Sequence, residues 1–337
     1  MASRHPPLSG EAGSLADALA ALDPDARLVA EERLSSRARR LTLTRGRRSS
    51  LVVKRVDRAV ARKTELLSSN LLPAVGLRDR GPPLLASLPG IGGSVWQVFE
   101  DLGDCALLPD RPQPGGLEAA TRLVARLHVA FAGHGLLREW IDELGGPGEH
   151  FYAGWMERAA RALETIEAPR LSSDRLALRD RLSRRVDALL EEEPGRTRRL
   201  REAGWPVTLL HGDLWPQNVL LPPRRDDRRR ARLIDWDQAG VGPVVYDLST
   251  FVSRFSPPVR IPALRLYRRA VRSVGWRLPD PADLNYAFET AEYARLASCL
   301  ISPAEAAAQG ADWGFEDLSE VDRWLAALRP VLPVTPR

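Results

Sequence analysis

Short apolar runs separated by turn-forming residues dominate the first part of the chain. Runs of about four to eight residues that are bounded by Gly, Pro or charged residues are typical of strands. They predict an antiparallel sheet, and the segment 57–72 between its third and fourth strands has a helical pattern. A short helix is expected over Ser14–Leu22, with residues 1–13 disordered. The predicted strands are Arg27–Ala30, Arg39–Thr44, Leu51–Val53, Leu84–Leu88 and Val95–Phe99.

Beyond residue 117 the apolar residues mostly recur at helical spacing. Leu123, Leu127 and Phe131 are spaced four apart, and this stripe predicts a helix over 117–131. The remainder of the chain is therefore expected to be mainly helical, apart from the stretch 207–238. Further helices are predicted over 150–166, 172–193, 262–274, 281–299 and 315–328.

The stretch 207–238 contains three short apolar runs instead of a helical pattern. Val207–Leu210, Val219–Leu221 and Leu233–Ile234 predict strands, the last two joined by a Pro/Arg/Asp turn. Asp213 and Asn218 lie on the loop after the first of these strands, and Asp235 ends the third. The spacing predicts that two carboxylates and an amide meet in one place; the alternative is two unrelated Asp-bearing turns between buried strands.

Two carboxylates and an amide are the groups that phosphoryl transfer requires. One carboxylate orients the attacking hydroxyl and accepts its proton, while the amide and the other carboxylate hold Mg²⁺ on the phosphates. Mg²⁺ prefers oxygen ligands and takes few of them from the protein. The stretch 207–238 is therefore a candidate phosphoryl-transfer site.

The order of these residues resembles the aminoglycoside phosphotransferase/choline kinase family of the protein-kinase-like superfamily. Its signature is H-G-D-x-x-x-x-N and a hydrophobic residue, followed later by a hydrophobic residue, D and W, F or L; His211–Asn218 and Ile234–Trp236 match it. The resemblance implies an α+β, two-lobed protein-kinase-like fold. We expect residues 1–100 to form a small nucleotide-binding lobe with a five-stranded antiparallel sheet and a helix. Residues 101–337 are then the large, mainly helical catalytic and substrate-binding lobe.

The resemblance also implies roles for individual residues. Asp213 becomes the catalytic base, and Asn218 and Asp235 become ligands of Mg²⁺. Lys54, on the third strand, would contact the phosphates of ATP or GTP, and Glu65 of the following helix would pair with it. His211 is interpreted as fixing the loop through backbone hydrogen bonds. Asp247 would likewise bond to backbone near the catalytic loop, His128 would pack between helices, and Asp237 is a reserve metal ligand.

The expected nucleotide contacts depart in one respect from protein kinases. The loop 31–38 has no glycine, so Ser35 and Ser36 are the candidates to offer hydroxyl and N–H groups to phosphate. By resemblance, the run Glu100-Asp101-Leu102-Gly103 marks the segment between the lobes, where adenine bonds to backbone. Phe99, Glu100 and Leu102 are therefore candidate nucleotide-binding residues.

The acceptor is the least constrained part of the prediction. Trp215 is a candidate wall of the substrate pocket, or a packing residue. Glu289, Glu292 and Asp312 are carboxylates that could bind a cationic acceptor, whereas Arg254 and Arg295 could face an anionic or neutral one. We expect an antibiotic of aminoglycoside, nucleoside or peptide type, phosphorylated for resistance or self-protection. The alternatives are a metabolic kinase acting on choline, homoserine, fructosamine or a sugar, and a catalytically inactive nucleotide-binding module.

Composition narrows the class of protein without changing this interpretation. The chain has 337 residues, 44% hydrophobic and 28% charged, which is ordinary for a globular protein. Its two cysteines are far apart, and its start has no apolar signal core, so we expect a cytoplasmic protein with no membrane partner. The net charge of +5 comes from scattered arginines, and no aromatic-rich strand pair accompanies them, so no nucleic acid partner is expected. A monomer or dimer is predicted. A protein kinase is disfavoured because the segment from Asp235 to Asp247 is too short to dock a protein.

Overall fold

The computed structural model describes residues 19, 22–145, 148, 151–167, 171–222 and 230–333. The expected disordered segment 1–13 and most of the expected helix Ser14–Leu22 lie outside these residues. The chain forms two compact units. The first comprises Met1–Ala106 and Asn218–Asp237, and the second comprises Leu107–Gln217 and Gln238–Arg337. The division near residue 100 into lobes of different function stays a prediction.

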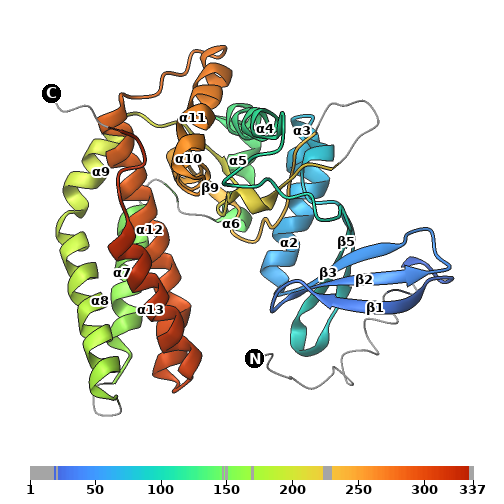
Figure 1. The fold of residues 1–337 in the computed structure, drawn as a ribbon, viewed down its shortest axis with the longest axis horizontal. Helices are drawn as coiled ribbons and strands as arrows, with labels where there is room; N and C mark the ends of the chain where they lie inside the picture. Colours follow the sequence, from blue (N-terminus) through green and yellow to red (C-terminus); the bar gives the residue numbers. More distant parts are fainter. Residues whose placement is uncertain are drawn as a thin grey trace. The chain divides into compact units, whose positions relative to one another are not determined.

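The first unit is built on a five-stranded antiparallel sheet, as predicted (Figure 1). Its order is β1-β2-β3-β5-β4. Alternate residues such as Leu41, Val53 and Val98 are buried, because successive side chains of a strand point to opposite faces. Edge strand β1 is exposed along its length. The strands are β1 Arg27–Arg33, β2 Ala38–Thr44, β3 Ser50–Val56, β4 Leu84–Pro89 and β5 Val95–Glu100.

A helical segment follows β3 and packs against the sheet. It begins with Asp57, whose carboxylate accepts a hydrogen bond from the Val60 N–H, a typical N-cap. Buried Gln97 of β5 donates to the Ala61 carbonyl and so joins sheet and helix. The predicted helix 57–72 is thus present, with a π-helical turn inside it. Its parts are α2 Arg58–Leu66, η1 Leu67–Leu71 and α3 Leu72–Ala74, and the short 3₁₀ turns η2 Arg78–Arg80 and η3 Ile91–Gly93 follow.

A small hairpin brings residues 218–237 into the first unit. Strands β7 (Val219–Leu220) and β8 (Arg232–Leu233) pair in antiparallel fashion, as the sequence predicted. Leu220 also forms a bridge with Ala106, and the Leu221 N–H donates to the Cys105 carbonyl. These backbone contacts attach a late segment of the chain to the end of the early one. The Arg/Asp turn of the hairpin lies mostly outside the described residues.

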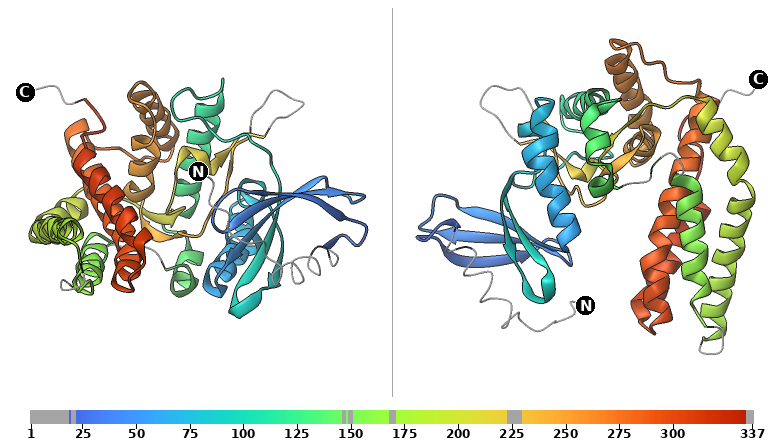
Figure 2. Two further views of the ribbon diagram at one scale, coloured as in Figure 1. Left: turned by 60° about the horizontal axis from the view of Figure 1, so that its bottom comes forward. Right: turned by 180° about the vertical axis from the view of Figure 1, so that it is seen from behind.

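The second unit is mainly helical (Figures 1 and 2). Helix α12 packs against α7, α10 and α13, and apolar side chains from these helices form a continuous core. The short ladder β6–β9 is formed by Val207–Leu210 and Gly240–Pro243. No helix in the described ranges is long and apolar enough to cross a membrane. The helices are α4 Gly116–Phe131, α5 Gly135–Glu139, α6 Ile141–Leu144, α7 Phe151–Glu164, α8 Ser173–Glu191, α9 Glu193–Glu202, α10 Val245–Ser253, α11 Pro257–Arg272, α12 Pro281–Ala308 and α13 Asp312–Ala327. The 3₁₀ turn η5 Pro216–Asn218 begins in this unit and ends on the first residue of the next segment of the first unit.

Candidate functional site

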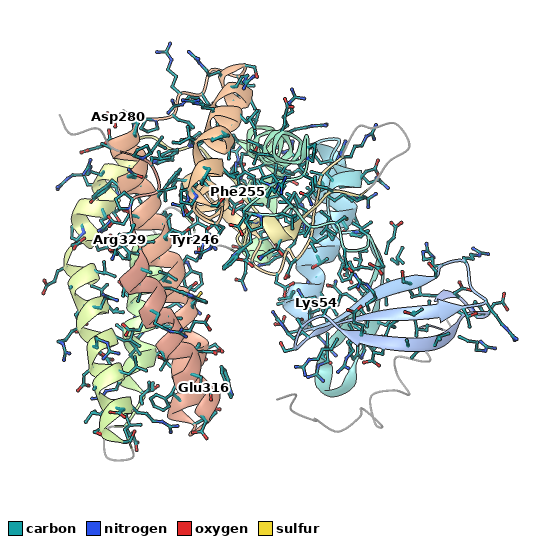
Figure 3. All side chains as sticks on the ribbon, viewed as in Figure 1. Lys54, Tyr246, Phe255, Asp280, Glu316 and Arg329 are labelled. Atoms are coloured by element: carbon teal, nitrogen blue, oxygen red, sulfur yellow. The ribbon has the colours of Figure 1, made fainter. Side chains whose placement is uncertain are left out.

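Lys54 of β3 forms the charged centre of the first unit (Figure 3). Its Nζ lies 2.5 Å from Asp235 Oδ1 and 2.7 Å from Asp237 Oδ1. The Lys54 side chain is 12% exposed and that of Asp237 9%, whereas Asp235 is 44% exposed. The structure thus brings Lys54 and Asp235, two of the predicted site residues, into direct contact.

Glu65 does not form the expected ion pair with Lys54 in this structure. It lies exposed on α2, and the ammonium contacts Asp235 and Asp237 instead. A helix presents residues at fixed angular intervals, and buried Thr64 and Leu66 occupy the inward face on either side of Glu65. The role of Glu65 in nucleotide binding stays a prediction, but the partner of Lys54 here is a pair of aspartates.

The two predicted metal ligands lie at the same end of the β7–β8 hairpin. The Asn218 carbonyl accepts a hydrogen bond from the Ile234 N–H at 2.9 Å, directly before Asp235. Asp235 has φ of +61°, a left-handed conformation that is uncommon for residues with a Cβ. Buried Trp236 donates from its indole to the Leu233 carbonyl at 2.9 Å, which fixes the turn. Strained backbone of this kind is concentrated at functional sites.

Further cations lie near Asp237. The Arg37 guanidinium lies 3.4 Å from Asp237 Oδ2. Burial lowers the pKa of Lys63, and the nearby charges of Asp237 and Asp57 act in the opposite direction. A cluster of lysine and arginine beside carboxylates can hold both a phosphate and the cation that accompanies it.

The donor atoms at this end of the first unit suit Mg²⁺. Among the described residues, no group of three or more His, Cys, Asp or Glu side chains is placed to hold a metal ion. Mg²⁺ does not need such a cage, because it usually binds one or two protein oxygens and completes its shell with water and phosphate. The amide of Asn218 and the carboxylate of Asp235 provide oxygens of that kind.

The other predicted nucleotide residues lie on exposed or half-buried backbone of the first unit. Ser35 Oγ accepts hydrogen bonds from the N–H groups of Arg37 and Ala38, so it stabilises its own turn. Ser36 is exposed in the same loop.

In the predicted adenine-binding segment, backbone groups bond to other residues of the first unit. Phe99 is half-buried in β5, and the Glu100 N–H donates to the Pro83 carbonyl at 2.9 Å. The Leu102 carbonyl accepts a weak bond from Cys105 Sγ at 3.3 Å. The Glu100 amide is therefore already used within the unit.

The loop that carries Asp213 belongs to the second unit and begins where β6 ends. Gly212 has φ of +82°, and a Cβ built there would lie 1.8 Å from the Gln238 carbonyl oxygen. No side chain fits at that distance, so glycine is required both for its conformation and for this close approach. His211 is fully buried beside it.

Asp247 of α10 binds the backbone of this loop through its carboxylate. Its carboxylate accepts hydrogen bonds from the N–H groups of His211 at 2.6 Å and Gly212 at 2.9 Å. Buried His128 lies 3.3 Å from the same carboxylate and 2.9 Å from the Tyr267 hydroxyl. The bracing role predicted for Asp247 and the packing role predicted for His128 are confirmed.

The carboxylate of Asp247 is kept ionised by these contacts. Complete burial by itself raises its pKa, but the hydrogen bond and charge of His128 and the interactions with His211 outweigh burial. The pKa of Asp247 is therefore held below its ordinary value. An ionised acceptor makes stronger hydrogen bonds to the loop than a neutral one.

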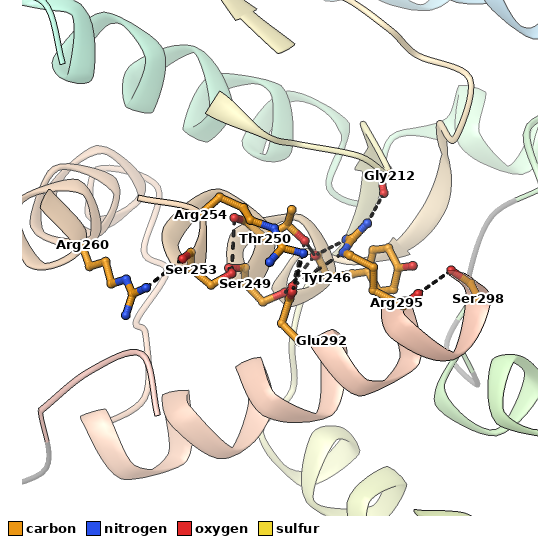
Figure 4. Close-up of polar contacts among 10 residues, drawn as sticks. All are labelled: Gly212, Tyr246, Ser249, Thr250, Ser253, Arg254, Arg260, Glu292, Arg295 and Ser298. Atoms are coloured by element: carbon orange, nitrogen blue, oxygen red, sulfur yellow. Dashed lines mark hydrogen bonds and ion pairs between the residues drawn. The ribbon is translucent and has the colours of Figure 1, made fainter. Parts of the chain in front are cut away.

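Arg295 of α12 holds the same loop from the other side (Figure 4). Its Nη1 donates to the Gly212 carbonyl at 2.6 Å and its Nη2 to the Tyr246 carbonyl at 3.0 Å. Asp213 itself is half-buried, and its carbonyl accepts from the Trp215 N–H at 2.9 Å. The candidate catalytic carboxylate thus sits on a loop fixed through backbone on both flanks.

Each of the predicted substrate residues has an arginine partner within the second unit. Half-buried Trp215 is covered by Arg254, whose guanidinium carbon lies 4.2 Å from the ring centroid. Glu292 is 1% exposed and bonds to Ser249 and Thr250, beside Arg254 and Arg295. Glu289 pairs with Arg196 at 3.3 Å, and exposed Asp312 pairs with Arg175 at 2.6 Å. The structure places Glu292 as an internal support rather than on a surface.

Sequence reasoning underestimated two residues. Asp237 was considered a reserve metal ligand, yet it is the more buried partner of Lys54. Its position two residues after Asp235 was the available signal. Arg295 was considered a substrate contact, yet it is 6% exposed and bonds to backbone. No signal in the sequence relates it to Gly212.

One family of known proteins matches most of the chain. The family model described as APH, phosphotransferase enzyme family, matches residues 25–282. No curated protein matches the chain.

Solved structures show the fold. The GDP and kanamycin complex of APH(2″)-IIia is 18% identical, with a TM-score of 0.57, over 92% of this chain and 98% of that chain. The choline kinase LicA from Streptococcus pneumoniae is 16% identical, with a TM-score of 0.60, over 93% and 98%. The complex of the spectinomycin phosphotransferase APH(9)-Ia with ADP and spectinomycin is 11% identical, with a TM-score of 0.56, over 90% and 92%. The predicted protein-kinase-like fold is confirmed.

Proposed function

Since the chain belongs to the phosphotransferase enzyme family, we propose that it transfers the γ-phosphate of ATP or GTP to a hydroxyl that Asp213 orients. The family makes it a small-molecule kinase with an alcohol group as acceptor. The observation that carries the residue assignment is the fixation of the loop before Asp213, whose backbone bonds to Asp247 and Arg295. Phosphoryl transfer depends mainly on positioning and charge stabilisation, so a rigidly held carboxylate suits it.

The donor site of the proposal lies around Lys54. Lys54 and Arg37 provide positive charge for the phosphates, and their present partners Asp235 and Asp237 are carboxylates that a bound Mg-nucleotide would replace or join. Asn218 and Asp235 would hold Mg²⁺, which when bound neutralises negative charge on the phosphates. Similar structures contain GDP or AMP, which supports a nucleotide donor.

The acceptor is proposed to be an antibiotic. Similar structures in complex with kanamycin and with spectinomycin support this class. Within it, Glu289, Glu292 and Asp312 are each paired with an arginine of the same unit. A polycationic acceptor would have to displace those arginines, at little cost for exposed Asp312 and at high cost for buried Glu292. The pairing therefore favours an acceptor of nucleoside or peptide type over a polycationic aminoglycoside.

A metabolic alcohol is the second candidate. The choline kinase LicA has a TM-score of 0.60 with this chain, a value close to those of the antibiotic kinases. Choline kinases and antibiotic kinases thus share the fold that this chain has. Trp215 argues against a quaternary ammonium at its ring, because Arg254 already covers that face.

Transfer of label from γ-labelled ATP and GTP to a panel of alcohols tests the proposal. The panel holds aminoglycosides, nucleoside and peptide antibiotics, macrolides, choline, homoserine, fructosamines and sugars. We expect a labelled product with an antibiotic. A product with choline, homoserine, fructosamine or a sugar alone would replace the antibiotic assignment with the metabolic one. Nucleotide binding with no product anywhere would contradict both and leave an inactive nucleotide-binding module.

A further inference from the structure

We propose that Arg295 is a positioning residue that sets the direction of the Asp213 side chain by clamping the peptide bond between Gly212 and Asp213. The inference rests on the proposed role of Asp213. Arg295 lies on α12, 83 positions beyond Gly212 in the chain. It does not touch the reacting groups in this assignment and acts through the loop backbone.

The contacts of Arg295 with Gly212 and Tyr246 (Figure 4) form a closed ring together with Asp247. One guanidinium nitrogen bonds to the Gly212 carbonyl at 2.6 Å and another to the Tyr246 carbonyl at 3.0 Å. Tyr246 directly precedes Asp247, and Asp247 accepts the Gly212 N–H at 2.9 Å. Both the N–H and the carbonyl of Gly212 are therefore held, the first by Asp247 and the second by Arg295.

Holding both groups of Gly212 determines where Asp213 points. A peptide bond is planar, so fixing the Gly212 carbonyl fixes the plane that ends at the Asp213 Cα. Glycine at φ of +82° has no side chain to restrain it, so these two hydrogen bonds supply the restraint. A small misplacement of a catalytic group can cost roughly 100-fold in rate.

The guanidinium is itself held in one position. Its Nε lies 3.6 Å from Glu292 Oε1, which also accepts bonds from Ser249 at 3.0 Å and Thr250 at 2.9 Å. Its carbon lies 4.3 Å from the centroid of the Tyr246 ring. Burial alone lowers the pKa of Arg295, but the nearby Tyr246, Glu292 and Asp213 outweigh burial and raise this pKa above its ordinary value, so the cation persists.

Glu292 also supports Trp215, two residues after Asp213. Its Oε2 lies 3.4 Å from Arg254, which covers the Trp215 ring. The Trp215 N–H in turn donates to the Asp213 carbonyl at 2.9 Å. One buried carboxylate therefore anchors both arginines that flank the catalytic loop, one before Asp213 and one after it.

A general stabilising role would not explain this arrangement. Buried ion pairs often stabilise a fold no better than apolar residues of similar size. Arg196 provides the comparison within the same unit: it is 5% exposed and bonds to Glu192, Glu289 and Thr290. Its guanidinium contacts side chains, namely Glu192 between α8 and α9, Tyr152 of α7 and residues of α12. Arg295 instead bonds to backbone carbonyls, one of them in the loop. The two arginines are matched in burial and differ in what they hold.

The test compares Arg295→Lys with Arg196→Lys. Lysine keeps the charge but cannot bridge two carbonyls as a planar guanidinium does. Amide hydrogen exchange of residues 208–217 and thermal unfolding are measured for each variant. The kcat and the KM for nucleotide are measured with the panel alcohol that the wild type phosphorylates. For Arg295→Lys we expect faster exchange in this segment and kcat roughly 100-fold lower with an unchanged nucleotide KM. Arg196→Lys should lower thermal stability without changing exchange of the loop or kcat.

Unchanged loop exchange and kcat in Arg295→Lys would overturn the inference, as would an equal loss of kcat in Arg196→Lys. If Arg295→Lys does not fold, the double variant Arg295→Met/Glu292→Gln removes both buried charges and takes its place, with the same expected result. If the wild type phosphorylates nothing in the panel, the proposed function fails, and loop exchange still decides whether Arg295 clamps Gly212.

Discussion

Two residues with unusual backbone conformations lie within the matched family motifs. Gly212 precedes Asp213 with φ of +82°, and Asp235 follows β8 with φ of +61°. The first is required by the approach of the Gln238 carbonyl, and the second is held although its Cβ disfavours that conformation. Both are local solutions that present a carboxylate at the end of a strand.

Gly212→Ala should disable the loop. The added methyl group would lie 1.8 Å from a backbone oxygen, so the loop must move, in addition to a conformational cost of about 1 to 2 kcal/mol. Gly204→Ala is the matched control, because Gly204 has φ of +62° in the same unit with nothing within 4 Å of its Cβ. Thermal unfolding and kcat of both variants measure the difference. Equal effects would show that the close approach to Gln238 does not matter.

Asp235→Asn should weaken Mg²⁺-dependent nucleotide binding by at least about tenfold, because a neutral amide is a poorer ligand than a carboxylate. Titration with a fluorescent nucleotide, with and without Mg²⁺, measures this. Asp79→Asn, at an exposed position of the same unit, should bind as the wild type does. An unchanged Mg²⁺ dependence in Asp235→Asn would remove Asp235 from the metal site.

At the scale of elements, the sequence pattern predicted the strands and helices whose buried faces follow a regular spacing. Strands β1 to β5 and most long helices were placed within a few residues, because alternating Leu41 and Leu43 or a stripe such as Leu123 and Leu127 reports the buried face directly. Strand β9 was missed, because Gly240–Pro243 has a composition that strands disfavour and exists through its pairing with β6.

Contacts between distant elements could not be predicted in the same way. The motif identified Asp213, Asn218 and Asp235, but the partner of Lys54 was assigned to Glu65 by analogy. The structure instead pairs Lys54 with residues 181 and 183 positions away. Such pairings depend on tertiary packing, which leaves no periodic trace in one sequence.

Helix α10 stabilises the loop that carries Asp213 through ionised Asp247, which makes its contribution dependent on pH. The pKa of Asp247 is lowered in the folded state, so its stabilisation is present above the unfolded value of about 3.9 and is lost as pH falls through the folded value. We expect Asp247→Asn to be less stable than the wild type by about 2 kcal/mol or more near pH 7, since bonds to a buried charge are lost. This difference should shrink as pH falls below about 4.

Urea unfolding of wild type and Asp247→Asn from neutral to acidic pH measures this prediction. Asp142→Asn, at an exposed position of the same unit, is the control and should follow the wild type at every pH. A constant difference between Asp247→Asn and wild type across the range would mean that the carboxylate charge does not hold the loop.

At the scale of the whole molecule, each compact unit contributes a separate part of the proposed chemistry. The first holds Lys54, Asn218 and Asp235, and the second holds Asp213 with its supports Asp247 and Arg295. Family membership and the motif were accessible from sequence because they depend on a few spaced residues. The acceptor was not accessible from sequence. The sequence does not show that the carboxylates of Glu289, Glu292 and Asp312 are paired with arginines, as they are in the structure.

The most direct test of the account is phosphate transfer by Asp213→Asn, measured beside its affinity for Mg-nucleotide. Using the alcohol that the wild type phosphorylates, we expect transfer to fall by roughly 100-fold or more while nucleotide affinity stays unchanged. Asp187→Asn, an exposed position on α8, is the control and should transfer at the wild-type rate. Transfer by Asp213→Asn at the wild-type rate would contradict the central claim that Asp213 orients the acceptor hydroxyl.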